Sequence, residues 1–177
     1  MTQLRIATVW LDGCSGCHMS FLDLDDRLLA LAERVQFAYS PLVDAKEFPP
    51  DVDITLVEGA VATQEDEERI RAIRRSTHFL IALGDCAVTG NVPSMRNQFA
   101  VDCVLQRAYL ENVDTNPAVP HCNLPALLPR CRAVHEIVPV DLFLAGCPPG
   151  RELIHFALSE LLEGRIPDVS LRSRFGA

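Results

Sequence analysis

Long apolar runs are missing from this sequence of 177 residues. No stretch approaches the roughly 20 apolar residues that a membrane-spanning helix needs. The opening residues MTQLRIATVW contain neither a charged segment followed by an apolar stretch nor a twin arginine. Basic residues are also outnumbered, since 16 Lys and Arg stand against 24 Asp and Glu, and nothing resembles a basic stripe. We therefore expect a cytoplasmic protein that binds no nucleic acid and inserts no segment into a membrane.

Internal repeats and low-complexity linkers are absent as well. With 49% apolar and 23% charged residues, the composition is that of a folded globular protein and excludes a disordered one. A chain of this length can bury about 70% of its unfolded surface in one core. We expect residues 1–177 to form a single domain.

Short aliphatic and β-branched runs alternate with amphipathic helical patterns along the chain. The predicted strands are Arg5–Leu11, Val35–Ser40, Asp53–Glu58, His78–Leu83 and Asp141–Ala145. The predicted helices cover Met19–Glu33, a segment that begins after Thr63 as N-cap with Asp66 at its third position, and Gly150–Leu162. Alternation of this kind predicts an α/β fold, a flavodoxin-like, doubly wound and mostly parallel sheet. Residues 112–131, with four prolines, are predicted to be a long irregular excursion.

Four of the seven cysteines follow predicted strands directly. Cys14 and Cys17 lie after the first strand, Cys86 after the fourth and Cys147 after the fifth. Ligands of open parallel sheets bind beyond the carboxyl ends of the strands, so these thiols should meet at one point. Adjacent glycines at positions 13, 16, 84 and 146 permit tight turns and free backbone N–H groups. Four thiolates arranged in this way suit a 4Fe–4S cluster.

Other interpretations of these cysteines remain open at this point. Cys14 and Cys17 alone could be a redox pair, but a thioredoxin-like site gives no role to Cys86 or Cys147. A structural zinc ion bound by four cysteines is the second alternative, in a flavodoxin-like scaffold, although such sites usually use two short-spaced pairs. The third alternative is four buried free thiols.

Several motifs together resemble a known family. They are Trp10–Cys17 (WLDGCSGC), Glu58-Gly-Ala, Gly84–Gly90 (GDCAVTG), Pro93–Asn97 (PSMRN) and Val140–Gly150 (VDLFLAGCPPG). Across residues 5–162 the chain resembles the small subunit of nickel–iron hydrogenases, above all the cytoplasmic, bidirectional, NAD(P)-reducing branch. A complex I-type quinone oxidoreductase subunit is the alternative; it typically has adjacent cysteines at its first site, whereas Ser15 and Gly16 separate them here.

The resemblance implies an electron-transfer subunit of a hydrogen:NAD+ oxidoreductase that lacks the catalytic centre itself. Cys14, Cys17, Cys86 and Cys147 match the ligands of the proximal 4Fe–4S cluster. The implied partners are a large subunit that carries the nickel–iron centre and the iron–sulfur and flavin subunits of a diaphorase module. Because the sequence ends soon after Cys147, one cluster is expected. Ala145 stands where many relatives have proline, which should change the rigidity of that turn without loss of ligation.

A few further residues carry predictions. Glu58 ends a strand at the same sheet edge, where it could relay protons or bind a cluster, or simply accept hydrogen bonds from a loop or helix N-terminus. His18 could donate to a cluster sulfur or pack at an interface. We do not expect a bound flavin in this chain, because no phosphate-binding loop follows the first strand. Cys103 is expected to be a buried thiol, and Cys122 and Cys131 are expected not to be ligands, although a second metal site near His121 is conceivable.

Overall fold

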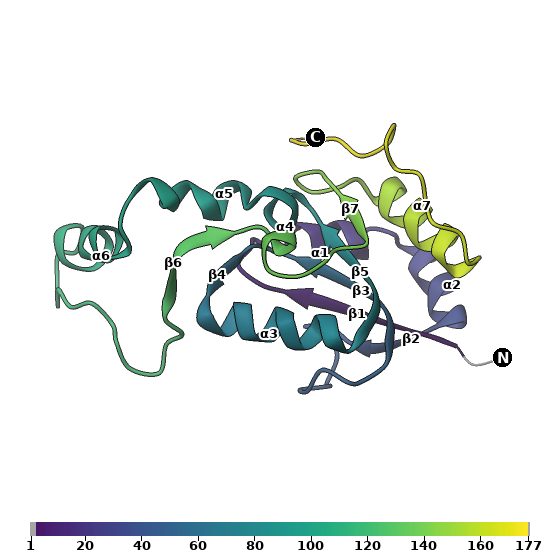
Figure 1. Cartoon of the computed structure of the whole chain (residues 1–177), viewed down its shortest axis with the longest axis horizontal. Helices are drawn as coiled ribbons and strands as arrows, with labels where there is room; N and C mark the ends of the chain where they lie inside the picture. The colour runs from purple at the N-terminus through teal and green to yellow at the C-terminus, as the bar shows by residue number, and fades with distance from the viewer. Residues whose placement is uncertain (1–2, 177) are drawn as a thin grey trace.

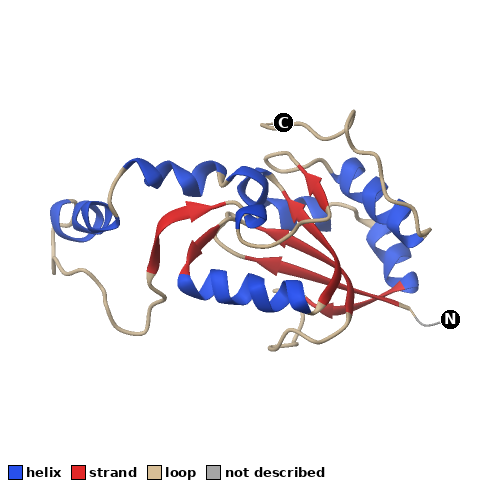
Figure 2. Ribbon diagram, in the orientation of Figure 1, coloured by secondary structure: helices blue, strands red, loops and turns tan. Residues whose placement is uncertain are grey.

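The computed structural model describes residues 3–176, which contain a five-stranded sheet with helices on both faces (Figures 1 and 2). Its strands are β1 (Leu4–Trp10), β2 (Val35–Tyr39), β3 (Val52–Glu58), β5 (Thr77–Leu83) and β7 (Leu142–Leu144), in the spatial order β2-β1-β3-β5-β7. All four neighbouring pairs are parallel. Counted within this sheet, the order is that of flavodoxin. The predicted α/β class and doubly wound parallel sheet are confirmed.

Successive strand residues point to opposite faces, so the sheet has a hydrophobic core on each side. On one face, Leu56 and Ile81 pack with α1 (Gly16–Leu22), α2 (Asp26–Arg34) and α7 (Arg151–Leu162). On the other face, Val57 and Leu80 pack with α3 (Gln64–Arg75), α4 (Asp85–Thr89) and the residues around the 3-10 turn η3 (Val134–Glu136). Strands β3 and β5 are therefore buried from both sides.

The helix predicted over Met19–Glu33 is two helices. It is interrupted between α1 and α2, where Asp25 has a positive φ of 51°. With ψ at −123°, this is a backbone conformation that residues other than glycine rarely adopt. Leu24 in the turn is 2% exposed, and Arg151 of α7 donates to the carbonyl of Asp23 at 3.2 Å. Burial of one leucine thus bends the chain at a point that the helical pattern does not reveal.

The predicted start of α3 is confirmed in detail. Thr63 Oγ1 accepts a hydrogen bond from the backbone N–H of Asp66 at 3.0 Å, and the carboxylate of Asp66 accepts one from the backbone N–H of Thr63 at 2.9 Å. This reciprocal pair is a capping box. α3 and α7 have 12 residues each, and none of the helices within residues 3–176 could span a bilayer.

Between α4 and β7 the chain leaves the sheet and returns to it. It passes through α5 (Asn91–Ser94), the 3-10 turn η1 (Met95–Gln98), α6 (Val101–Gln106) and the π-helical turn η2 (Arg107–Glu111), which extend to the left in Figure 1. The predicted irregular excursion holds for residues 112–126. It is wrong from residue 127, because β6 (Leu127–Arg132) pairs antiparallel with β4 (Val61–Thr63). Pro129 is tolerated there because the two-stranded ladder is irregular between its paired residues.

The PSMRN motif fastens this returning strand. Asn97 donates through Nδ2 to the carbonyl of Cys131 at 2.8 Å and accepts from the N–H of Cys131 at 2.7 Å. Arg96 donates to the carbonyls of Ala62 and Leu128, both at 3.1 Å. The Asn97 side chain thus completes the backbone pairing of β6, and the Arg96 side chain joins β4 to β6.

Replacement of Asn97 by alanine should therefore destabilise the protein. Asn97→Ala leaves both backbone groups of Cys131 without their partner, which is expected to lower the free energy of unfolding by about 2 kcal/mol. Gln98→Ala is the matched control, because Gln98 is exposed and its side chain donates only to Met95 O at 3.4 Å. Urea denaturation of both variants measures the effect. Equal midpoints for Asn97→Ala and Gln98→Ala would contradict this role.

Candidate metal centre

The four cysteines singled out by the sequence lie at the carboxyl edge of the parallel sheet. Cys14 is exposed in the loop between β1 and α1, and Cys17 is buried in the first turn of α1. Cys86 is partly buried in the first turn of α4, directly after β5, and Cys147 is exposed in the loop between β7 and α7. Three strand ends thus bring four residues together that are up to 133 positions apart (14 to 147) in the sequence.

The four thiols lie near enough to one another to affect each other's ionisation. Burial raises the pKa of the Cys17 thiol far above its ordinary value, and the charges of Glu58, Cys86, Cys14 and Cys147 raise it further. Burial likewise raises the pKa of Cys86 to about 11, with further contributions from Cys147 and Cys14. Burial and the negative charge of each of the other three thiolates therefore both oppose ionisation of Cys17.

Gly84 provides the space into which the Cys17 side chain extends. A Cβ atom added to Gly84 would lie 2.2 Å from Cys17 Sγ, and the backbone there has a positive φ of 84°. A side chain at position 84 would therefore be strained in its backbone and would collide with the sulfur. The glycine of the GDC motif is required by the position of a thiol from a different strand end.

Asp85 joins the two later cysteine turns. Its carboxylate is buried, with the residue 5% exposed, and accepts a hydrogen bond from the N–H of Gly146 at 2.7 Å. The backbone N–H of Asp85 donates in turn to the carbonyl of Gly146 at 2.9 Å, and Gly84 N–H donates to Leu144 O at 2.8 Å. The turns that carry Cys86 and Cys147 therefore form one hydrogen-bonded unit.

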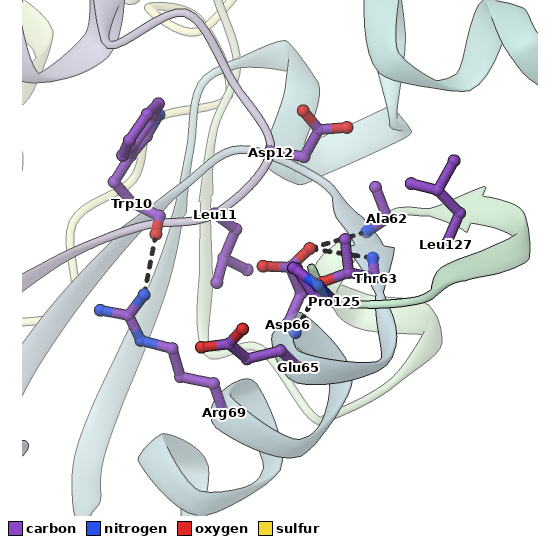
Figure 3. A pocket seen from close by; sticks show the side chains of 10 residues that line it. All are labelled: Trp10, Leu11, Asp12, Ala62, Thr63, Glu65, Asp66, Arg69, Pro125 and Leu127. Atoms are coloured by element: carbon purple, nitrogen blue, oxygen red, sulfur yellow. Dashed lines mark hydrogen bonds between the residues drawn. The ribbon is translucent and has the colours of Figure 1, made fainter. Parts of the chain in front are cut away.

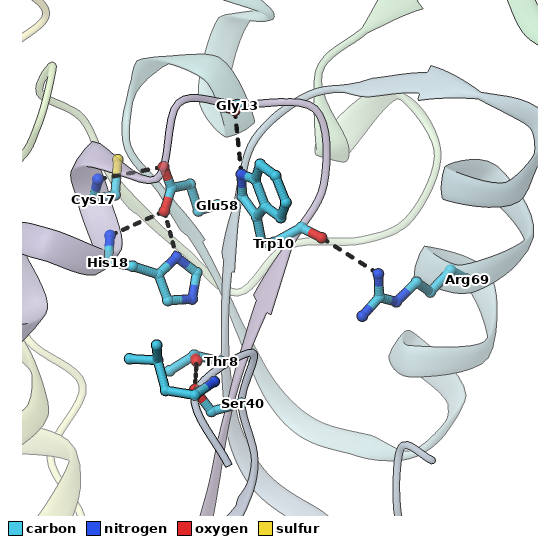
Figure 4. Close-up of polar contacts among 9 residues, drawn as sticks. Thr8, Trp10, Gly13, Cys17, His18, Ser40, Glu58 and Arg69 are labelled. Atoms are coloured by element: carbon cyan, nitrogen blue, oxygen red, sulfur yellow. Dashed lines mark hydrogen bonds and ion pairs between the residues drawn. The ribbon is translucent and has the colours of Figure 1, made fainter. Parts of the chain in front are cut away.

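Glu58 and His18 form a buried pair beside Cys17 (Figure 4). Glu58, 1% exposed, accepts hydrogen bonds from the backbone N–H groups of Cys17 at 3.3 Å and His18 at 2.9 Å. A second contact joins its carboxylate to His18 Nδ1. One of the roles considered for Glu58, a hydrogen-bond acceptor at a helix N-terminus, is thus present. Its role as a proton relay remains a prediction.

The loop that carries Cys14 is attached to the end of β3. Asp12 and Ala60 exchange backbone hydrogen bonds at 3.0 and 2.8 Å, and Leu11 N–H donates to Glu58 O at 2.9 Å. Gly59 lies against this loop, and a Cβ there would be only 2.8 Å from the backbone carbon of Leu11. The Glu58-Gly-Ala motif therefore fixes the first cysteine loop to the sheet.

A small hollow opens next to His18. Its volume is about 100 Å³, and its lining includes Trp10, Met19 and Leu42, which are 44%, 57% and 63% exposed. His18 is 7% exposed, and its Nε2 is buried without a hydrogen-bond partner among the described residues. The indole of Trp10 donates to Gly13 O at 3.2 Å, while the side chain remains half exposed. The hollow is therefore lined by exposed apolar side chains and by a buried histidine.

A larger hollow of about 360 Å³ lies on the other side of β1, near the start of α3 (Figure 3). Two of its charged side chains already have structural partners: Asp66 belongs to the capping box, and Arg69 donates to Trp10 O at 3.4 Å and to Tyr39 Oη at 2.7 Å. Burial raises the pKa of Asp12 at its rim, and nearby Asp66 adds to that rise. None of the four cysteines lines this hollow.

The remaining cysteines are placed differently from one another. Cys131 is buried, and burial raises its pKa to about 11. Cys103 is exposed on α6, so the expectation of a buried thiol there is wrong: α6 continues directly into η2, and this helical segment packs against β6 and not against the five-stranded sheet. Cys122 is exposed in the irregular segment. No three His, Cys, Asp or Glu side chains within residues 3–176 lie close enough together to hold a single metal ion.

Comparison with known proteins gives the family. The profile of the family described as "NADH ubiquinone oxidoreductase, 20 Kd subunit" matches residues 14–161. The delta subunit of the NAD-reducing hydrogenase HoxS of Cupriavidus necator is 39% identical over 168 residues, covering 92% of this chain and 80% of that protein. A subunit of the F420-non-reducing hydrogenase of Methanothermobacter thermautotrophicus is 33% identical over 177 residues, covering 96% of this chain and 58% of that protein.

A solved structure extends the likeness to three dimensions. A chain of an NAD+-reducing [NiFe]-hydrogenase in the H2-reduced state superimposes with a TM-score of 0.93 at 44% identity, covering 98% of this chain and 99% of that one. The chain belongs to the family of the 20 kDa subunit of NADH ubiquinone oxidoreductase, in its branch of hydrogenase small subunits. The resemblance inferred from the motifs, and with it the oxidoreductase class, is confirmed.

Proposed function

We propose that this chain holds one 4Fe–4S cluster on Cys14, Cys17, Cys86 and Cys147. In the cytoplasm, it would pass electrons between the nickel–iron centre of a large subunit and a diaphorase module that reduces NAD(P)+. The observation that carries the proposal is the convergence of these four thiols from three strand ends, on a fold shared at 44% identity with a chain of an NAD+-reducing hydrogenase.

The residues at the site fit a cluster of this kind. Two of the thiols are exposed and two lie deeper, Cys17 in the space left by Gly84. Asn91 Nδ2 lies 3.7 Å from Cys147 Sγ, within reach of the weak hydrogen bond that a ligand sulfur accepts. Hydrogen bonds to the sulfurs and burial are the means by which a protein sets the potential of a cluster.

A single zinc ion fits the site less well. Zinc holds its four sulfurs about 2.3 Å from one point. Structural zinc sites usually use two short-spaced cysteine pairs. Here one short-spaced pair, Cys14 and Cys17, is joined by two cysteines that are far apart in the sequence, which favours the cluster over the zinc-containing scaffold.

The cluster, when bound, supplies one-electron transfer. The protein holds it and controls its surroundings. Glu58 fixes the first turn of α1 through the N–H groups of Cys17 and His18, and Asp85 fixes the two later turns to each other. Exposure of Cys14 and Cys147 leaves the centre accessible from one side, where a second subunit would exclude water.

The hollow beside His18 supports docking of a partner at this edge. Exposed Trp10, Met19 and Leu42 line this hollow together with the buried His18, which suits an apolar side chain of a partner. Apolar patches of this kind commonly mark interfaces. We assign this edge to the large subunit, because the cysteines lie beside it.

Leu42→Glu should therefore weaken the assembly while leaving the fold intact. A charge on this rim would have to be desolvated on docking, and we expect the dissociation constant for the large subunit to rise roughly tenfold or more. The control is Ile166→Glu, which changes a residue that is 78% exposed beyond the far end of α7. Size-exclusion chromatography at decreasing concentration measures both variants, and equal dissociation would argue against this docking surface.

Chemical analysis tests the cofactor directly. Protein purified without oxygen should contain about four irons and four labile sulfides per chain, and no stoichiometric zinc. Stoichiometric zinc without sulfide would instead establish the scaffold alternative.

A further inference from the structure

The C-terminal segment lies against the cysteine turns. After α7 the chain runs back along that helix toward the turn that follows β7, drawn in yellow in Figure 1. Ser173 Oγ accepts a hydrogen bond from the N–H of Ala145 at 2.7 Å and lies 3.3 Å from the carbonyl of the same residue. Gly176 N–H donates to Asp85 Oδ2 at 2.7 Å. One contact therefore reaches each of the two later cysteine turns.

The same segment is attached to the body of the protein by contacts of a different kind. Val169 packs against the core on the α7 face of the sheet. The guanidinium of Arg172 lies 4.2 Å from the centre of the Phe156 ring on α7, and the N–H groups of Arg172 and Ser173 both donate to Val169 O. Residues 169–176, which we name the C-terminal strap, are thus connected to α7 at one end and to the cysteine turns at the other.

The two residues that the strap contacts, Asp85 and Ala145, lie within the turns that carry Cys86 and Cys147. Asp85 directly precedes Cys86, and Ala145 is two residues before Cys147. The two carboxylate oxygens of Asp85 have separate partners, Gly146 within the turns and Gly176 in the strap. Ala145 is buried, and its contact requires a backbone N–H that a proline would not have. Movement of the strap would therefore change the positions of both the Cys86 and the Cys147 thiol.

We propose that the C-terminal strap holds the turns of Cys86 and Cys147 in their ligating arrangement and thereby slows the loss of iron from the site. This inference rests on the proposed function, since it concerns retention of the cluster. Ser173 and Asp85 are positioning residues: Ser173 touches no thiol and acts through Ala145, and Asp85 acts through both turns. The strap contributes to how long the cluster stays bound, not to which residues bind it.

The test uses the complete anaerobically purified assembly and compares iron release to an excess of chelator. Ser173→Ala should start with the same iron content as the parent and release it about fivefold faster, because local opening becomes more frequent when one contact is lost. The double variant Arg172→Ala/Ser173→Ala should release it faster still. Ser170→Ala is the matched control, since it makes the same chemical change in the strap, at a residue whose backbone bonds to Asp168 and not to the cysteine turns.

A second measurement does not depend on the cluster. Trypsin should cleave after Arg174 faster in Ser173→Ala than in Ser170→Ala, because the strap leaves the turns more often. If Ser173→Ala released iron and was cleaved at the parent rates, the proposal that the strap slows iron loss would be wrong. A parent protein without iron and sulfide would overturn the proposed function, and this inference with it.

Discussion

The Cys86→Ser variant is expected to assemble with its partner subunits and to lose hydrogen-dependent NAD+ reduction by roughly a hundredfold or more. Serine keeps nearly the size of cysteine, so the first turn of α4 should form as before. Its hydroxyl, however, binds cluster iron much less well than a thiolate does. The measurement is the rate of NAD+ reduction under hydrogen, with iron content determined on the same preparation.

Cys103→Ser is the matched control for this variant. Cys103 is also in the first turn of a short helix, but it is exposed on α6. Its replacement should leave both activity and iron content unchanged. If Cys86→Ser retained full activity, the ligand assignment of Cys86 would be wrong.

Gly84→Ala is expected to give a folded chain with less than about a tenth of the normal iron. The new Cβ would lie 2.2 Å from Cys17 Sγ, so this sulfur would have to leave its position. With φ 84° and ψ 161°, the backbone at residue 84 lies in a region that essentially only glycine adopts, so alanine adds a strain of roughly 1–3 kcal/mol. Iron and sulfide content, together with circular dichroism to verify folding, measure the outcome.

Two further glycines separate the causes of this effect. Gly164 also has a positive φ, but a Cβ there meets nothing within 4 Å, so Gly164→Ala carries the strain without the collision. Gly150, close to Cys147, has an ordinary φ of −62° and open space, so Gly150→Ala carries neither. Both variants should load iron normally. Equal loss of iron in Gly164→Ala would show that an alanine at positive φ lowers the iron content without any contact with the Cys17 sulfur, which would contradict this account.

The fold can be predicted where local sequence and packing agree. All five strands of the parallel sheet and the capping box of Thr63 and Asp66 follow from runs and spacings that the structure confirms. The break at Asp25 cannot be predicted, because it follows from burial of Leu24 and from a contact with Arg151 of α7. The β4–β6 pair escapes prediction because Pro129 signals a loop and because Asn97 supplies part of the pairing.

The metal centre, like the fold, can be predicted from the sequence only in part. The positions of the four cysteines follow from strand ends, which the sequence reveals. The supporting contacts do not: Asp85 bridges residues 61 positions apart, and the strap reaches back from residue 173 to residue 145. His18 adjoins Cys17 in the sequence, yet only the structure reveals its pairing with Glu58. A glycine near each cysteine is the one available signal, and Gly84 marks the place of another residue's sulfur.

Hydrogen-dependent reduction of NAD+ by the native assembly, purified without oxygen through a tag on this chain, is the decisive measurement. An artificial dye serves as a parallel electron acceptor. We expect reduction of both acceptors, which would establish the hydrogenase and its diaphorase partner together. Reduction of the dye without reduction of NAD+ would support a hydrogenase but contradict the proposed diaphorase partner. Reduction of neither, by a preparation that contains iron and sulfide, would contradict the proposed function and favour a quinone-linked subunit of the complex I type.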